Sequence, residues 1–108
     1  VNLMNNLTQQ IYQNVDTSAD FLAGINPYWS KSEWVSLLSA FTSMHIEEST
    51  ALLTQEYERN VAVFDRILAH TNIIGDYFSQ ATAATVSSLL FDTKYMQNIY
   101  RFYYLVKV

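Results

Sequence analysis

The chain of 108 residues has no cysteine, one proline and two glycines. The lack of cysteine excludes disulfide bonds, thiolate metal sites and cysteine nucleophiles. The few prolines and glycines leave little to interrupt a helix, and two glycines are too few for a glycine-rich loop that binds phosphate. No apolar run reaches the roughly 18 residues of a membrane span, so we expect no membrane partner. No signal peptide is evident, and we expect a cytoplasmic protein.

Positive charge is also scarce. Residues 1–90 carry nine acidic residues against Lys31, Arg59 and Arg66, a net charge of −6, whereas residues 91–108 carry a net charge of +2. An acidic surface repels the phosphate backbone of nucleic acids, and the few basic residues of the tail do not reverse this repulsion. We therefore expect no nucleic-acid partner.

Apolar residues recur every three or four positions through residues 1–90, which predicts helices at about 2–23, 31–53 and 56–84. In the first expected helix the apolar stripe is Leu3, Leu7, Ile11, Val15, Ala19 and Leu22. In the second it is Trp34, Leu37, Leu38, Phe41, Met44, Glu48 and Leu52. In the third it is Tyr57, Val61, Phe64, Leu68, Thr71, Ile74, Phe78 and Ala81. Short connections between such helices favour antiparallel neighbours. The sequence thus predicts an all-α antiparallel bundle of three long helices with up-down topology.

The expected helices have recognisable ends. Gly24 can adopt the left-handed conformation that closes a helix, and Pro27 disfavours a helical residue before it. Ser30 and Glu33 fit a capping box, in which each side chain binds the backbone N–H of the other residue. Thr54 is a candidate cap for the third helix.

Aromatic residues gather in two places. Tyr28, Trp29 and Trp34 surround the single proline. We expect them to fasten the entry of the second helix to the core, in preference to binding a planar ligand. Residues 91–108 form an aromatic segment that would aggregate if exposed, so we expect it to pack on the bundle or on a partner chain. A short fourth helix from about 91 to 104 is its expected form.

Two carboxylates fall on or beside the expected apolar stripes. Glu48 interrupts the stripe of the second helix, and Asp65 follows Phe64 in the third. A buried carboxylate is costly unless it is paired and hydrogen-bonded. The candidate partners are Arg59, Arg66, His45, His70 and the Tyr57 hydroxyl. The first interpretation is a polar clasp between helices. The alternatives are a small-ligand pocket anchored by Glu48, Asp65, His45 and Tyr57 and simple exposure of the carboxylates at the surface.

A metal site is the weakest alternative. Carboxylate-bridged di-iron bundles use Glu-x-x-His on two helices, whereas here the reversed pair His45 and Glu48 occurs once. A second ligand set would need Asp65, His70 and Asp76, and its two aspartates lie about 16 Å apart along a helix. We therefore assign no metal, no cofactor and no catalytic residue, and no His/Asp pair is placed to activate a serine.

Several short motifs between residues 14 and 79 match a known pattern without a gap. They are Asn14-Val15-Asp16, Phe21-Leu22, Ile25-Asn26-Pro27, Glu48-Ser49, Glu56-Tyr57, Phe64-Asp65, Gly75-Asp76 and Ser79. The chain in this region resembles the C-terminal half of a family of small uncharacterised bacterial helical-bundle proteins. The resemblance implies a helical-bundle fold and no defined activity. Two histidines of the family pattern fall on Phe41 and Leu68, and the N-terminal helical half of the family lies outside this chain.

Three broad apolar helices and an aromatic tail rarely suffice as a monomer. We therefore expect a homo-oligomer, or docking onto the helical half that the chain lacks. The favoured function is a non-catalytic assembly or interaction module. The alternatives are a small-ligand-binding or sensor bundle with a buried polar anchor and, last, a ferritin-like metal-binding bundle.

Overall fold

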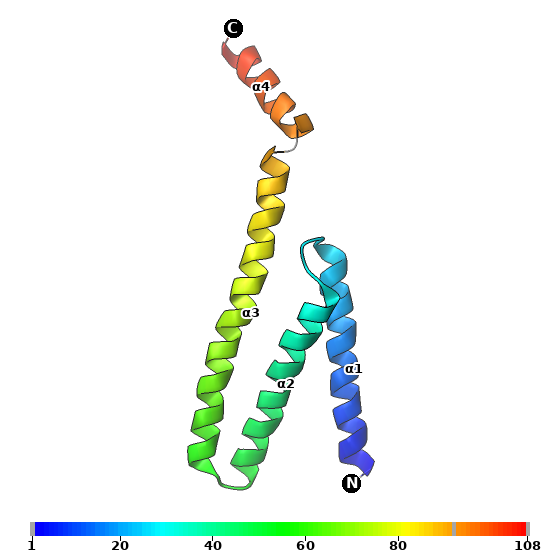
Figure 1. Cartoon of the computed structure of the whole chain (residues 1–108), viewed down its shortest axis with the longest axis vertical. Coiled ribbons are helices and arrows are strands. Elements are labelled where there is room, and N and C mark those ends of the chain that lie inside the picture. The colour runs from blue at the N-terminus through cyan, green and yellow to red at the C-terminus, as the bar shows by residue number, and fades with distance from the viewer. Residues whose placement is uncertain (1, 92, 108) are drawn as a thin grey trace.

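The computed structural model describes residues 2–91 and 93–107, with side chains for residues 2–90 and 97–107. It contains four helices, α1 (Asn2–Ile25), α2 (Lys31–Leu53), α3 (Tyr57–Phe91) and α4 (Thr93–Lys107). Figure 1 shows α1, α2 and α3 running alternately up and down, with α4 continuing beyond the end of α3. The predicted all-α fold with up-down topology is confirmed.

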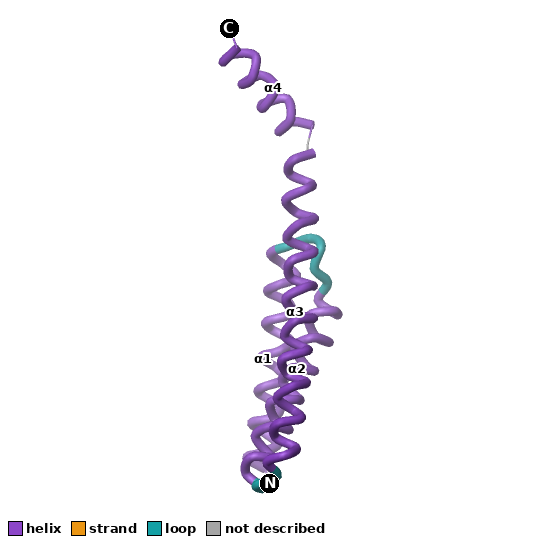
Figure 2. Tube along the Cα trace, turned by 90° about the vertical axis from the view of Figure 1, so that its left-hand side faces the viewer, coloured by secondary structure: helices purple, strands orange, loops and turns teal. Residues whose placement is uncertain are grey.

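The three long helices form one open layer with α2 in the middle. Helix α2 packs against α1 on one side and α3 on the other, and over the described residues no Cα atom of α1 comes within 8 Å of one in α3. Turned edge-on, the molecule is thin (Figure 2), and its extents are 73 × 29 × 18 Å. Helix α2 is therefore the only one of the three that is flanked on both sides.

The larger part of the core lies where the connection from α1 enters α2. Its buried residues come from all three helices and the loop, and they are Ala19, Trp29, Trp34, Leu37 and Ala81. The centres of the two tryptophan rings lie 5.4 Å apart in an edge-to-face arrangement, and the Phe78 ring packs at a tilt against Trp29, with 4.9 Å between ring centres. Both tryptophans are buried while Tyr28 is half exposed, so the tryptophans fasten the helix entry to the core, as predicted.

A second, smaller core lies nearer the turn between α2 and α3. Met44 of α2 packs there against Val63 and Ile67 of α3, and Ala40 and Phe41 are partly buried beside them. Val63 is the largest fully buried side chain, with 1% of its surface exposed. These contacts fix which side of α3 faces α2.

The helix ends differ from expectation in three ways. Gly24 does not adopt a left-handed conformation, because α1 continues through it to Ile25. Ser30 caps α2 by accepting the Glu33 N–H at 3.0 Å, but its own N–H donates to the Tyr77 hydroxyl of α3 at 2.9 Å, so Tyr77 takes the place of the second half of the capping box. Thr54 ends α2 rather than starting α3.

The predicted face of α3 is correct in the second half of the helix, where Ile74 and Ala81 pack in the core, and wrong in the first half. The buried residues of α3 are Val63, Ile67 and Ala81, whereas Phe64, Leu68 and Tyr57 of the predicted stripe are half exposed or more. Helix α3 carries two apolar stripes, and the one with smaller side chains faces α2. In the first half of α3 the prediction selected the other stripe, which contains the larger side chains of Tyr57, Phe64 and Leu68.

Helix α3 runs seven residues further than predicted, and α4 follows as the fourth helix. Lys107 lies 5.4 Å from the centre of the Tyr103 ring, a cation–π contact within α4. The side chains of residues 97–107 are all exposed. Packing of this segment on the three long helices is therefore not seen, and packing on a partner chain stays a prediction. The side chains of Phe91, Lys94 and Tyr95 lie outside the described residues.

None of the helices, over the part of the chain that the structure describes, has the length and apolar character that a membrane crossing requires.

We predict that Ile67→Ala lowers the free energy of unfolding by about 2–5 kcal/mol, because it leaves a cavity between α2 and α3. Ile67 is 6% exposed, whereas Ile73, on the same helix, is 54% exposed. Ile73→Ala is therefore the matched control, with an expected loss of no more than about 0.5 kcal/mol. Urea unfolding followed by circular dichroism measures both, and equal losses would contradict the observed face of α3.

Candidate functional site

The four residues proposed to anchor a ligand do not converge. His45 and Glu48 lie together on α2, with a distance of 3.2 Å between the His45 Nδ1 and a Glu48 carboxylate oxygen. Asp65 is exposed on α3, and Tyr57 is 62% exposed at the start of that helix. The structure thus joins two of the four residues and leaves the other two apart.

A polar clasp between helices exists, but neither predicted carboxylate forms it. The expected arginine partners of Glu48 and Asp65 bind Glu47 instead. Arg66 of α3 donates to one Glu47 oxygen at 2.9 Å, and Arg59 donates to the other at 3.4 Å. The prediction that Asp65 is a buried clasp residue is therefore wrong. Sequence reasoning missed Glu47 because the register between α2 and α3 decides which neighbouring glutamate meets the arginines.

The two arginines lower the pKa values of the glutamates that they contact. The hydrogen bond from Arg66 lowers the pKa of Glu47, against a smaller opposing effect of burial, and Arg59 lowers it further. The pKa of Glu56 is lowered first by the Thr54 hydroxyl, at 2.7 Å, and then by Arg59. Both carboxylates therefore stay charged below the pH at which a free glutamate is protonated.

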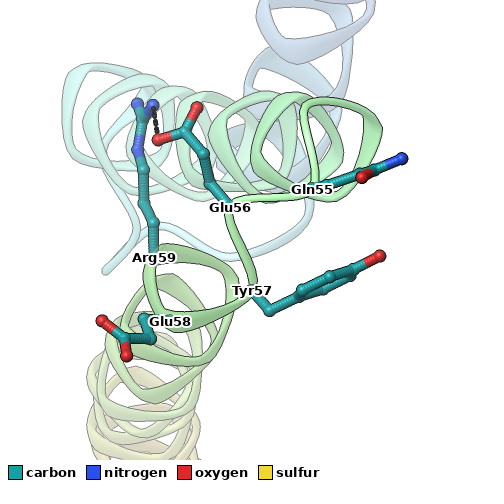
Figure 3. Close-up of a pocket in the computed structure, with 5 residues that line it drawn as sticks. All are labelled: Gln55, Glu56, Tyr57, Glu58 and Arg59. Carbon is teal, nitrogen blue, oxygen red and sulfur yellow. Dashed lines mark hydrogen bonds and ion pairs between the residues drawn. The ribbon is translucent and has the colours of Figure 1, made fainter.

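The turn between α2 and α3 contains a hollow of about 440 Å³, lined by five consecutive residues, Gln55, Glu56, Tyr57, Glu58 and Arg59. Figure 3 shows that the Tyr57 side chain points away from the Glu56–Arg59 ion pair. Gln55 has a positive φ of 61°, which makes the reversal compact. Because a single turn supplies every lining residue, this hollow is the inside of the turn and not a ligand cleft between elements.

A groove of about 460 Å³ lies between α1 and α2. Its lining residues are Met4, Ile11, Phe41, Thr42, His45, Ile46, Ser49, Thr50 and Leu53. Most of its wall is apolar, and His45 is its one ionisable residue. Of the predicted ligand residues, only His45 therefore lies in a cleft between two helices.

Helix α3 carries an apolar stripe on one broad side of the layer. At about 100° per residue, Phe64 and Leu68 lie roughly 100° around α3 from Val63 and Ile67, which meet α2. Arg66 lies around α3 in the opposite direction, toward Glu47. The stripe therefore faces one broad side of the layer, and the ion-paired cluster faces the other.

Helix α1 also has an exposed apolar stripe on one side of its buried residues and acidic residues on the other. The direction of rotation from the buried residues to the apolar stripe is the reverse of that in α3. Leu7 lies roughly 100° and Leu3 roughly 140° around α1 from the buried Val15 and Ala19, and Asp16 lies on the other side. Because α1 and α3 run in the same direction and meet α2 from opposite sides, their two exposed stripes come to the same side of the layer. Helix α2 contributes Leu52 on this side, and the His45–Glu48 pair lies one to two turns before Leu52 on the same stripe. We call the whole surface the apolar face, comprising Leu3, Leu7, Phe21, Ile25, Leu52, Tyr57, Val61, Phe64, Leu68 and Phe78, all exposed.

The opposite surface of the layer is polar. On α2 it presents hydroxyl side chains at helical spacing, namely Ser32, Ser36, Ser39, Ser43 and Thr50. Beside them lie the ion pairs of Glu47 with Arg59 and Arg66. We call this surface the polar face. The layer is thus apolar on one side, apart from the His45–Glu48 pair, and polar on the other.

Metal ligands do not gather in this structure. Over the residues that are described, no three His, Asp or Glu side chains are close enough to hold a metal ion together. Asp65, His70 and Asp76 supply no second ligand set, and the His70 Nε2 lies 2.7 Å from the Leu37 carbonyl oxygen. His70 is therefore occupied in joining α3 to α2.

Comparisons with known proteins give no relative: no family model, no curated protein and no solved structure matches the chain.

We predict that Glu47→Gln destabilises the fold at neutral pH and that this difference disappears in acid. The lowered pKa of Glu47 means that its contribution is complete above the ordinary glutamate pKa of 4.5 and is lost as the pH falls through its own lower pKa. Thermal unfolding from pH 7 downward measures the difference. Glu58→Gln is the control, because Glu58 forms none of the ion pairs found among the described residues. A pH-independent effect of Glu47→Gln would contradict the assignment.

Proposed function

We propose that the chain is a non-catalytic assembly module whose apolar face receives another helical surface. One observation carries this proposal: the exposed apolar stripes of α1 and α3, with Leu52 of α2, lie on the same side of one layer. Domains are ordinarily built from two or more packed layers, and apolar patches of this extent on a protein surface mark interaction sites. The layer therefore corresponds to half of a two-layer core.

The distribution of charge supports the same function. The charged residues of α1 are Asp16 and Asp20. Both pair with Lys31, on the side of α1 away from the exposed apolar stripe of that helix. On α3, Arg59 and Arg66 pair with Glu47 on the polar face. On α2, Glu48 shares the stripe of Leu52 and lies 3.2 Å from the His45 ring, so a helical partner that covers the apolar face would meet one polar pair among apolar side chains and no arginine or lysine.

We also propose that the protein is cytoplasmic and belongs to the bacterial helical-bundle family that its motifs resemble. A cytoplasmic location and membership of the bacterial helical-bundle family are compatible with an assembly module. The exposed side chains of α4, including Phe102 and Leu105, add a second surface that a partner could cover.

We predict that Leu68→Glu weakens coverage of the apolar face, while Ala69→Glu, one position along and exposed toward the edge of the layer, does not. If self-association covers the face in the wild type, light scattering will show an oligomer. If the face is free, the wild type will bind a hydrophobic dye. Leu68→Glu should reduce whichever signal the wild type gives by at least about twofold, because it places a charge among apolar side chains. A wild-type monomer that binds no dye would overturn the proposal.

The groove between α1 and α2 supports small-ligand binding as a second candidate function. Its apolar wall and the His45–Glu48 pair at its rim suit an apolar molecule with one polar group. A ligand at a hundred times its dissociation constant stabilises a protein by about 2.7 kcal/mol.

We predict that any such ligand response in a thermal-shift screen of small amphiphiles is reduced by Glu48→Gln, which alters the partner of His45. Asp65→Asn should leave the response unchanged, because Asp65 is exposed on α3, away from the groove. Equal effects of the two substitutions would exclude the groove as the binding site.

A further inference from the structure

Helix α4 lies apart from the layer that the three long helices form. Over the described residues, no Cα atom of α4 comes within 8 Å of one in α1 or α2, and the side chains of residues 97–107 are all exposed. Figure 1 shows α4 beyond the end of α3. The described side chains of α4 are therefore open to a partner.

These side chains are divided by chemistry around the helix. The apolar side of α4 consists of Ile99, Phe102, Tyr103 and Val106, all exposed. At about 100° per residue, these four side chains fall within roughly 100° of one another. Gln97 and Arg101 lie on the opposite side of the helix, and Leu105 lies between the two sides. Such an amphipathic helix buries its apolar side and keeps the other side in water.

Helix α4 is basic, although the chain as a whole is acidic. Residues 93–107 include Lys94, Arg101 and Lys107 and no acidic residue, whereas residues 1–90 have a net charge of −6. Asp92, just before α4 in the sequence, offsets one of the three positive charges. The Lys107 ammonium group lies 5.4 Å from the centre of the Tyr103 ring, at the edge of the apolar side of α4. Positive charge and an apolar side therefore occur on the same helix.

The acidic residues of the layer lie too far along α3 to cancel this charge. The last charged residue of α3 is Asp76, because residues 77–91 contain no charged residue. A helical segment of this length spans about 22 Å, which is nearly three times the Debye length of about 8 Å at physiological salt. The uncharged end of α3 thus separates the basic α4 from the acidic layer.

We propose that α4 binds the surface of an anionic lipid membrane, with the apolar side of α4 toward the acyl chains. An anionic membrane offers an apolar medium and negative charge together, and the binding of an amphipathic helix increases with both. Tyr103 suits this position, because a tyrosine ring enters the apolar region while its hydroxyl stays among the headgroups. Phosphate groups alone, as in a nucleic acid, would leave the apolar side of α4 uncovered.

The shape of the molecule favours a membrane over an extended protein partner for α4. The structure is 73 Å long, and α4 lies at one end of it (Figure 1). Helix α4 can therefore reach a negatively charged surface while the acidic layer stays more than a Debye length away. A partner that also lay along the layer would gain nothing from this separation.

This inference goes beyond the proposed function and needs no membrane-spanning helix. The expectation of no membrane partner rested on the lack of an apolar run of spanning length. A helix that lies in the membrane surface is recognised instead by an apolar side, a charged polar side and low overall hydrophobicity. Because α4 is short, we expect its binding to be reversible and to require both apolar contact and charge.

The first test measures co-sedimentation of the wild type with lipid vesicles. We predict that it binds vesicles of phosphatidylcholine with about one third phosphatidylglycerol at least about tenfold more tightly than vesicles of phosphatidylcholine alone, because the positive charges of α4 meet an anionic surface. At about 1 M salt, where the Debye length is about 3 Å, this preference should disappear.

Two substitutions that change charge equally separate the apolar contribution from the electrostatic one. Phe102→Glu and Gln97→Glu each add one negative charge, but only Phe102 belongs to the apolar side of α4. We predict that Gln97→Glu weakens binding to the anionic vesicles by no more than about fivefold. Phe102→Glu should weaken it at least about tenfold more, because it also removes a phenyl ring that the membrane would bury. Neither residue belongs to the core of the three long helices, so thermal unfolding should not change.

A fluorescence measurement reports the orientation of α4 directly. The chain has no cysteine, so Ile99→Cys and Gln97→Cys each provide a single thiol for a polarity-sensitive fluorophore. On addition of the anionic vesicles, emission from position 99 should shift to shorter wavelength, and emission from position 97 should not.

The outcomes separate this inference from the proposed function. A wild type that does not sediment with anionic vesicles would overturn it, and if Phe102→Glu then dissociates a wild-type oligomer, the partner of α4 is a protein surface. Equal effects of Phe102→Glu and Gln97→Glu, or equal shifts at the two fluorophores, would also overturn it. A loss of vesicle binding in Leu68→Glu as large as in Phe102→Glu would place the membrane contact on the apolar face and overturn the role of α4. Absence of vesicle binding would leave the apolar face as a docking surface.

Discussion

The double packing of α2 is the constraint on which the rest of the structure depends. Helix α2 meets α1 along one side and α3 along the opposite side, and its buried residues include Trp34, Leu37, Met44 and Ala51. Since the two flanking helices do not meet, each buries a single narrow stripe, and the remaining apolar residues stay exposed. The turn at Gln55 and the ring cluster around Trp29 hold the three helices in this order. The one-sided apolar surface follows from that order.

The existence, direction and approximate bounds of the helices could be predicted from the sequence, because apolar periodicity and the Ser30 cap are local signals. The start and end of α2 were predicted correctly at residues 31 and 53. The buried side of α3 was predicted at Ile74 and Ala81 but not in the first half of the helix. Both of its stripes have helical spacing, and only the position of α2 decides that Val63 and Ile67 are buried while Phe64 and Leu68 are not.

The candidate site was less predictable than the fold for the same reason. His45 and Glu48 are three residues apart on one helix, so their contact could be predicted from spacing alone. The pairing of Glu47 with Arg66 joins residues 19 positions apart and requires the register of α2 against α3. Similarly, the acceptor for the Ser30 N–H is the Tyr77 hydroxyl, 47 positions away. Local motifs contain no information on either contact.

The separation of α1 from α3 is the most direct test of this account. Because the chain has no cysteine, spin labels can be placed at Gln9→Cys and Ala62→Cys, two exposed positions on the polar face. Double electron–electron resonance on labelled chains diluted with unlabelled protein gives the distance within one chain. An open layer predicts about 16–20 Å between the axes of α1 and α3, twice the usual helix spacing. A separation of about 8–10 Å would show a closed three-helix arrangement and contradict the account.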